Sequence, residues 1–215
     1  MSGITYDYMS RYLKDIIGES HGVLKELEDY AEENNIPIVR KETARMIEFM
    51  VTTKKPKKIL ELGTAIGYSS ILMALALNEQ VEIDTIERDE KMVEIAKHNI
   101  KKAGLDNTIN IMQGDCLDIL QGMDGMYDMV FIDAGHGHYC EFLPHILRLL
   151  SEDGMIIADN VLFRGMVACN ELMVKRKITI VKRMRKYLDM VSHDDNLVTT
   201  VLPMGDGIAL TVRRN

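Results

Sequence analysis

Short apolar runs alternate with longer amphipathic stretches over most of the sequence between residues 58 and 159. The apolar runs predict strands at 58–62, 81–87, 108–112, 128–133 and 154–159, and the amphipathic stretches predict helices at 67–77, 89–103 and 139–150. Consecutive strands that are joined through a helix pair in parallel, with helices on both faces of the sheet. The alternation therefore predicts an α/β fold with a parallel sheet.

The two ends of the chain depart from this pattern. Up to about Met50, apolar residues such as Val23, Leu27 and Ala31 recur at helical spacing and predict helices beside the sheet. A helix at 171–191 is expected to precede strands at 197–202 and 208–213, which are too close in sequence to pair in any way but antiparallel. We predict one domain over residues 1–215, a Rossmann-like, mostly parallel doubly wound sheet with N-terminal helices and a C-terminal antiparallel strand pair.

Composition limits the compartment and the partners. Cys116, Cys140 and Cys169 are too few and too scattered for a disulfide framework or a zinc ribbon, and no apolar run approaches the roughly 20 residues that span a bilayer. We therefore expect a cytoplasmic protein with no membrane partner. The net charge of −7 argues against a general nucleic-acid binder, yet residues 164–186 hold eight basic residues and one acid.

The segment at 61–70 joins the first predicted strand of the sheet to a helix. Its glycines allow backbone to approach a ligand, and the helix start offers free N–H groups. The segment has only two glycines, Gly63 and Gly67, whereas the GxGxxG motif that binds dinucleotides has three. It is therefore a poor binding site for a pyrophosphate. Glu61 suits a cationic, amino-bearing ligand better, and S-adenosylmethionine carries a sulfonium and an amine. A plain tight turn is the alternative.

Two further acids stand where strands are predicted to end. Glu87 closes the second strand, some twenty residues beyond Gly67, a position from which a carboxylate reaches the two hydroxyls of an adenosine ribose. Asp115 follows Gly114 after the third strand and precedes Cys116. Its side chain could contact an adenine edge, and it could equally cap a helix.

The sharpest signal in the sequence is a set of three oxygen-bearing side chains after two neighbouring strands. Asp133 ends the fourth predicted strand, and Asp159 and Asn160 end the fifth. The carboxyl ends of adjacent parallel strands meet at one edge of the sheet, so these side chains should lie together. Two carboxylates and an amide suit a hard cation such as Mg²⁺ and do not suit zinc. Strand-end caps without a metal are the alternative.

Two histidines lie in the glycine-containing loop that follows Asp133. His136, three residues after a predicted ligand, could exchange a proton near neutral pH. His138 has a plain surface role as an equal alternative.

Together these stretches resemble the class I, metal-dependent O-methyltransferases of the catechol and caffeoyl-CoA type, from about Ile36 to the C-terminus. Residues 159–165 (DNVLFRG) are most similar to the bacterial branch that includes the tRNA 5-hydroxyuridine methyltransferase. The resemblance implies Mg²⁺ or another hard divalent cation, and a homodimer. The metal ligands that it implies are Asp133, Asp159 and Asn160. The cofactor contacts that it implies are Val39, Glu61, Gly63, Ser69, Glu87, Asp115, Cys116 and Asp133.

One position departs from that family. Where this chain has His136, the family usually has a lysine that is proposed to deprotonate the substrate hydroxyl. Histidine could do the same with an ordinary pKa of about 6.5. Alternatively, the metal alone acidifies the hydroxyl and His136 positions the substrate.

The main functional prediction is Mg²⁺-dependent methylation of 5-hydroxyuridine in tRNA by S-adenosylmethionine. The basic stretch would then seat phosphates, and its RNA-contacting candidates are Arg164, Lys182, Arg185 and Lys186. The nearest rival is methylation of a small catechol-like metabolite, with the basic stretch incidental. A nonenzymatic RNA-binding protein and an NAD-dependent oxidoreductase are more distant rivals.

Overall fold

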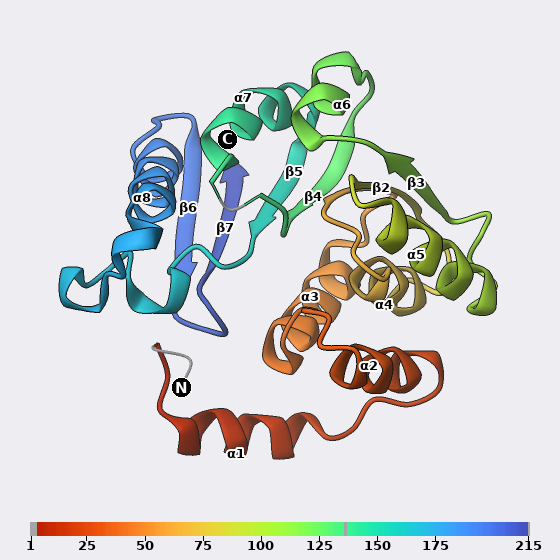
Figure 1. Ribbon diagram of the computed structural model, residues 1–215. Coiled ribbons are helices and arrows are strands. Elements are labelled where there is room, and N and C mark those ends of the chain that lie inside the picture. Colours follow the sequence, from red (N-terminus) through yellow and green to blue (C-terminus); the bar gives the residue numbers. More distant parts are fainter. Residues whose placement is uncertain (1–3, 136, 215) are drawn as a thin grey trace.

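The computed structural model describes residues 4–135 and 137–214. It has three layers, with a seven-stranded sheet in the middle and helices on each of its faces (Figure 1). The strands are β1 (Lys58–Leu62), β2 (Glu82–Glu87), β3 (Ile109–Gln113), β4 (Tyr127–Ile132), β5 (Leu150–Ala158), β6 (Leu197–Leu202) and β7 (Ile208–Arg213). Their order is β3-β2-β1-β4-β5-β7-β6. The first five strands pair in parallel, and β7 lies antiparallel between β5 and β6. The predicted Rossmann-like fold with its antiparallel C-terminal pair is confirmed.

Helices cover both faces of this sheet. They are α1 (Asp7–Ile17), α2 (Val23–Glu33), α3 (Lys41–Lys54), α4 (Tyr68–Ala76), α5 (Glu90–Lys102), α6 (Cys116–Gly122), α7 (Tyr139–Leu149) and α8 (Ile178–Ser192). Side chains alternate between the two faces of a strand, so Leu60 packs in the core beneath α6, α7 and α8, while Ile59 packs in the core beneath α2 to α5. Because both faces are covered, the central strands β4 and β5 carry unbroken apolar runs at 129–132 and 155–158.

Two boundaries in the middle of the chain differ from the prediction. Helix α6 was not predicted, because its seven residues are too few to show a helical period. Strand β5 begins at Leu150, four residues before the predicted start at Gly154. Its early residues are polar and exposed, and the pairing with β4 shifts register near Tyr127, so no regular alternation marks them.

The C-terminal helix is shorter than predicted. Residues 171–177, expected to be helical, instead form the short 3-10 turns η2 (Asn170–Leu172) and η3 (Lys175–Lys177), and α8 starts at Ile178. Leu172 and Val174 are exposed, so a helix there would bury no apolar face, and three adjacent cations would add repulsion. Burial starts with α8, whose Val181 and Met184 are fully enclosed.

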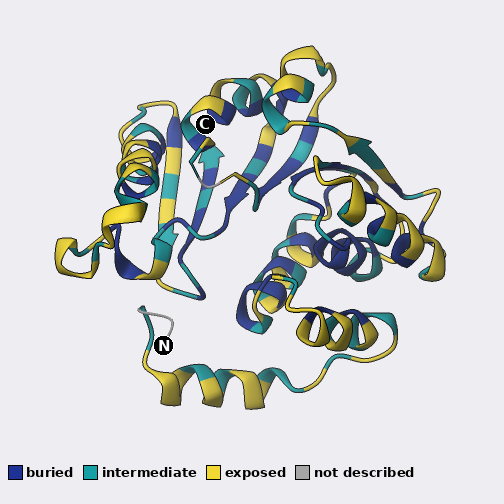
Figure 2. Cartoon of the chain, viewed as in Figure 1, coloured by how far each residue is buried: buried dark blue, intermediate teal, exposed yellow. Residues whose placement is uncertain are grey.

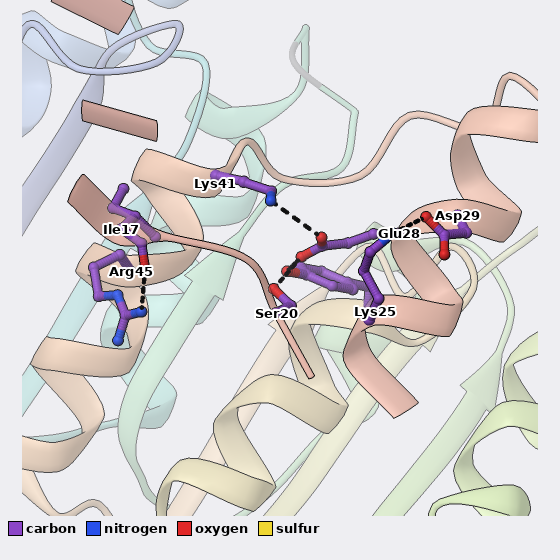
Figure 3. Close-up of polar contacts among 8 residues, drawn as sticks. Ile17, Ser20, Lys25, Glu28, Asp29, Lys41 and Arg45 are labelled. Atoms are coloured by element: carbon purple, nitrogen blue, oxygen red, sulfur yellow. Dashed lines mark hydrogen bonds and ion pairs between the residues drawn. The ribbon is translucent and has the colours of Figure 1, made fainter. Parts of the chain in front are cut away.

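Polar contacts attach the N-terminal helices to the core (Figure 3). The Glu28 carboxylate on α2 accepts hydrogen bonds from Ser20 at 2.5 Å and from the Tyr68 hydroxyl of α4 at 2.7 Å. Lys41, the first residue of α3, lies 3.6 Å from the same carboxylate. Glu28 therefore joins the α1–α2 connection, α3 and α4 at one point, next to the segment that carries Val39.

Helix α1 lies outside this arrangement. None of its residues is buried, and Tyr8, Tyr12 and Ile16 are each at least 60% exposed. Figure 2 shows this helix mostly in the yellow of exposed residues. Arg45 of α3 donates a hydrogen bond to the Ile17 carbonyl and fixes the end of the helix. Within the described part of the chain, no helix has the length and apolar character needed to cross a membrane.

Candidate active site

A cleft of about 850 Å³ opens at the carboxyl ends of the parallel strands, where α/β sheets commonly bind their ligands. It is bounded by the loops after β1, β2, β3, β4 and β5, by the segment before α3, and by the β6–β7 turn. The residues selected from the sequence that line it are Val39, Gly63, Glu87, Asp115, Cys116, Asp133, Asp159, Asn160 and Arg164. The selected residues outside its lining are Glu61, Ser69, Lys182, Arg185 and Lys186.

The loop after β1 is a close-packed turn that leads into α4. Gly63 has a φ of +103°, and a Cβ built on it would lie 2.9 Å from the Ala134 Cβ and 3.1 Å from the Asp133 carbonyl. Gly67 caps α4 in the left-handed region, with a φ of 86°. The buried Asn99 side chain donates to the Ile66 carbonyl at 2.9 Å and supports the loop from behind. Glycine at 63 thus allows the β1 loop to touch the loop that follows β4.

Glu61 is fully buried under this loop. One carboxylate oxygen accepts hydrogen bonds from Ser70 and, at 2.6 Å, from Thr85, and Ser69 also bonds the carboxylate. The other oxygen, Oε1, has no partner among the described residues. Burial raises the pKa of Glu61, although the three hydroxyls act against this. A buried acceptor without a donor costs free energy of folding, and the positive charge of a ligand amine above the turn would offset part of that cost.

Glu87 and Asp115 lie along the next part of the cleft. Glu87 accepts from the backbone N–H of Ala65 at 2.9 Å and from those of Arg88 and Asp89, which fixes its carboxylate at the end of β2. Asp115 caps α6 by accepting from the Leu117 N–H at 2.9 Å, and it also lines the cleft. Both roles that the sequence left open for Asp115 are therefore compatible. Burial raises the pKa of the Cys116 thiol to about 12, so it remains neutral.

The predicted trio of Asp133, Asp159 and Asn160 is brought together. The Asn160 amide donates to the Asp133 carboxylate at 2.8 Å, and the Asn160 backbone N–H donates to the Asp159 carboxylate at 2.6 Å. The Asp133 N–H bonds the Leu62 carbonyl and the Asp159 N–H bonds the Ile132 carbonyl, so the strand ends fix both backbones. Asn160 has a φ of 60°, a left-handed conformation that Asn adopts more easily than most residues.

The charges of this trio favour a cation. Burial raises the pKa of Asp133 well above its usual range, and the charges of Asp159 and Glu61 add to that rise. Burial also raises the pKa of Asp159 to about 6. No described lysine or arginine forms an ion pair with either carboxylate. The described residues contain no metal-binding group made of three His, Cys, Asp or Glu side chains, and here the third side chain is the amide of Asn160. Two carboxylates and an amide that faces them fit a hard divalent cation, with positions left for water and substrate.

These pKa shifts predict opposite pH dependences for the metal-free fold and for cation binding. The stability that Asp159 contributes to the metal-free protein is fully present below the unfolded carboxyl pKa of about 3.9, and it is lost as pH rises through about 6. Cations compete with the protons of both carboxylates, so Mg²⁺ affinity should rise about tenfold or more per pH unit below 6 and rise less steeply once Asp159 is ionised. Calorimetric titration between pH 5 and 8 measures this. An affinity that does not change with pH, or that changes equally in Asp159→Asn, would contradict it.

The predicted proton acceptor His136 lies outside the described residues. His138 lines the cleft and pairs through Nδ1 with the Glu141 carboxylate, and its ring lies 6.2 Å from that of Phe142. His138 therefore already has a partner on the surface of α7.

Two residues for which the sequence predicted no role, Arg40 and Asp206, also line the cleft. Arg40, at the start of α3, lies 3.2 Å from the Asp206 carboxylate in the β6–β7 turn, and both face the cleft. The backbone oxygen of Asp206 accepts from the N–H groups of Leu162 and Phe163. A carboxylate between two glycines, Gly205 and Gly207, is the available signal in the sequence, but this pattern is also typical of a plain turn between two strands.

The basic stretch divides into two parts. Arg164, Arg176 and Lys177 line the cleft, and the Lys177 ammonium lies 5.7 Å from the centre of the Phe163 ring. Arg185, one of the predicted RNA contacts, is half-buried and donates to the carbonyls of Val167 and Met166. Lys182 and Lys186 are exposed on α8, away from the cleft lining.

Comparisons with known proteins agree with this geometry. The family model described as O-methyltransferase matches residues 14–214. A catechol O-methyltransferase of Niastella koreensis is 30% identical over 223 residues, which cover 99% of this chain and 99% of that relative. A caffeoyl-CoA O-methyltransferase of Stellaria longipes is 30% identical over 79% of this chain and 73% of its own length.

Solved structures extend the likeness to the whole fold. An O-methyltransferase from Bacillus cereus in complex with SAH has a TM-score of 0.84 at 26% identity, covering 96% of this chain and 97% of that one. A Staphylococcus aureus protein, named as an unconfirmed caffeoyl-CoA O-methyltransferase, has a TM-score of 0.89 at 32% identity and covers 97% of this chain and 100% of its own. This chain therefore belongs to the class I O-methyltransferase family of the catechol and caffeoyl-CoA type, and it is an S-adenosylmethionine-dependent O-methyltransferase.

Proposed function

We propose that this enzyme methylates one of two neighbouring oxygens of its acceptor with the help of a hard divalent cation. The observation that supports this most directly is the trio of Asp133, Asp159 and Asn160, which lies in the same cleft as the glycine turn and Glu87. Two neighbouring acceptor oxygens would complete a six-coordinate cation that has three protein ligands and water. Since the chain is an S-adenosylmethionine-dependent methyltransferase, the two more distant alternatives, a nonenzymatic RNA-binding protein and an NAD-dependent oxidoreductase, are not pursued as functions of this site.

Each part of the chain has a separate task in this proposal. Asp133, Asp159 and Asn160 would hold the cation, which when bound lowers the pKa of a chelated hydroxyl. Glu87 would bind the ribose of the cofactor. Glu61, which is fully buried and lies outside the cleft lining, would attract the cofactor amine from beneath the glycine turn. Hydrogen bonds from backbone N–H groups fix Glu87 and Asp159 before any ligand enters, which would help to hold the acceptor oxygen and the methyl group in register. Effective molarities of about 10⁵ to 10⁸ M are available from such orientation.

The first candidate acceptor is a small catechol-like compound. The supporting observation is the full-length similarity to the Niastella koreensis catechol O-methyltransferase. The second candidate is 5-hydroxyuridine in tRNA, whose hydroxyl and neighbouring carbonyl offer the same pair of oxygens. Arg164, Arg176 and Lys177 support it, because three cations along the cleft suit an acceptor with phosphates.

Transfer of labelled methyl from S-adenosylmethionine separates the candidates. The enzyme is incubated with catechol or with tRNA from cells that lack 5-methoxyuridine, each with Mg²⁺ or with EDTA. Label in a catechol ether that EDTA abolishes would support the first candidate, and label in 5-methoxyuridine would support the second. Turnover that persists in EDTA would contradict the metal proposal for either acceptor.

We expect the double variant Arg164→Ala/Arg176→Ala to raise the KM of a phosphate-bearing acceptor by roughly tenfold per lost contact. The KM of a neutral catechol should stay within about twofold, because the trio holds its oxygens. The matched control is Lys182→Ala/Lys186→Ala, which removes the same charge from outside the cleft. Steady-state kinetics at a fixed salt concentration measures both KM values. If the control variant raises the KM of tRNA equally, Arg164 and Arg176 contribute no more to RNA binding than cations outside the cleft.

Two further features remain proposals. We propose that His136 accepts the hydroxyl proton, which predicts a loss of kcat without a loss of cofactor affinity in His136→Ala.

We also propose a homodimer. The exposed face of Tyr8, Tyr12 and Ile16 on α1 is an apolar surface that a second copy would cover, and a monomeric mass in light scattering would contradict this.

A further inference from the structure

Tyr139 lies directly beneath the proposed metal ligands. It is the first residue of α7, it is 1% exposed, and its hydroxyl lies 3.1 Å from the Ile132 carbonyl and 3.0 Å from the Asp159 carbonyl. One hydroxyl therefore bonds the ends of two neighbouring strands, β4 and β5. No part of the proposed reaction uses this group.

The two carbonyls belong to peptides that carry the metal ligands. The Ile132 carbonyl is in the peptide that precedes Asp133, and the Asp159 carbonyl is in the peptide between Asp159 and Asn160. The N–H of that second peptide donates to the Asp159 carboxylate at 2.6 Å. The Tyr139 hydroxyl therefore fixes one end of a peptide whose other end fixes the Asp159 side chain.

The backbone here needs such support. Asn160 has a φ of 60°, a conformation that costs free energy for any residue with a Cβ. Tyr139 also closes the loop from Ile132, seven residues away, so the loop that follows Asp133 is held at both ends. Outer groups that orient metal ligands commonly change metal affinity by about 10- to 100-fold.

We propose that the Tyr139 hydroxyl is a positioning group that sets the spacing of Asp133 and Asp159 for a divalent cation. This inference rests on the proposed function, because it requires a cation at the trio. It assigns no contact with substrate or cofactor to Tyr139.

The chain offers a matched control in Tyr187 of α8. Its ring packs edge-on against that of Tyr139, with centroids 5.3 Å apart, and it is equally buried. Its hydroxyl has no hydrogen-bond partner among the described residues. Tyr139→Phe and Tyr187→Phe thus remove the same atom from one core, and only the first removes a bond to the strand ends.

The test is a calorimetric titration of the metal-free protein with Mn²⁺, followed by the KM for Mg²⁺ and for S-adenosylmethionine. We expect Tyr139→Phe to weaken Mn²⁺ binding about 10- to 100-fold and to raise the KM for Mg²⁺ in parallel, with the KM for S-adenosylmethionine unchanged. Tyr187→Phe should match the wild type. Unaltered Mn²⁺ binding in Tyr139→Phe, or equal losses in both variants, would overturn the inference.

Two controls keep the outcomes distinct. If the wild type binds no Mn²⁺, the proposed metal function fails and this inference fails with it. If the wild type binds Mn²⁺ and Tyr139→Phe binds it equally well, the inference alone fails. Saturating S-adenosylhomocysteine stabilises a marginal variant by mass action, so the titration can be repeated in its presence. A Tyr139→Phe protein that stays unfolded even then would assign the hydroxyl to folding and overturn the positioning role.

Discussion

Asp133→Asn is expected to lower kcat/KM by about 10² to 10³-fold. The side chain keeps its size and its place after β4, but one of the two carboxylates that face the proposed cation is lost. Removing one partner of a buried charge pair costs about 3–5 kcal/mol, and each 1.4 kcal/mol is a factor of ten in rate or affinity. Raising Mg²⁺ should recover part of the activity, and the Kd of S-adenosylmethionine should change by only a few-fold.

Asp128→Asn is the control for this experiment. Asp128 lies at the opposite end of the same strand, where its carboxylate accepts from the backbone N–H groups of Lys57 at 2.7 Å and Lys58 at 3.1 Å. Its loss should reduce the free energy of unfolding by about 1 kcal/mol and leave kcat/KM unaltered. If both variants lose activity to the same degree, the loss in Asp133→Asn reflects general damage to β4.

Gly63→Ala should reduce S-adenosylmethionine affinity by more than about 100-fold and destabilise the fold by about 2–5 kcal/mol. The added Cβ would lie 2.9 Å from the Ala134 Cβ and 3.1 Å from the Asp133 carbonyl, so the β1 loop and the loop after β4 must separate. Overpacking of this kind costs about 1–3 kcal/mol, and the left-handed φ of +103° adds about 1–2 kcal/mol. Calorimetric titration and urea unfolding measure the two effects.

Gly125→Ala separates the contact from the conformation. Its φ of +107° nearly equals that of Gly63, yet a Cβ there would have no neighbour within 4 Å. We expect this variant to lose about 1–2 kcal/mol of stability and to bind S-adenosylmethionine normally. Matching losses of affinity in the two variants would show that backbone strain, and not the approach of the two loops, accounts for the effect.

Most of the fold could be predicted from the sequence because its signals are local. The apolar runs of β4 and β5 are uninterrupted where the strands are covered on both faces, and Glu61 alone interrupts the run of β1. The short β6–β7 connection leaves an antiparallel pair as the only arrangement. The trio was predictable because the ends of adjacent parallel strands meet at one edge. Asp133, Asp159 and Asn160 needed no knowledge of packing to be placed together.

What could not be predicted depends on contacts between distant segments. The register shift near Tyr127 that extends β5 to Leu150 has no local pattern. Arg185 looked like a surface residue by periodicity, but its bonds to the backbone at Val167 depend on how η1 (Phe163–Gly165) folds against α8. The sequence marks Tyr139 only as an apolar-face residue of a helix and Asp206 only as a turn residue. The Asp159 carbonyl that Tyr139 bonds and the N–H groups of Leu162 and Phe163 that Asp206 bonds belong to other segments, so no local pattern reveals these contacts.

The position of β7 bears on the order in which the enzyme is made. Strand β7 follows β6 in the sequence but lies between β5 and β6 in the sheet, and just before it the Asp206 and Gly207 carbonyls accept from the N–H groups of Leu162 and Val161. The turn after Asn160 therefore lacks these two bonds until residues 206–213 have been synthesised. A nascent chain can complete α4 and the glycine turn early, but the proposed metal ligands gain this support only after β7 has been made.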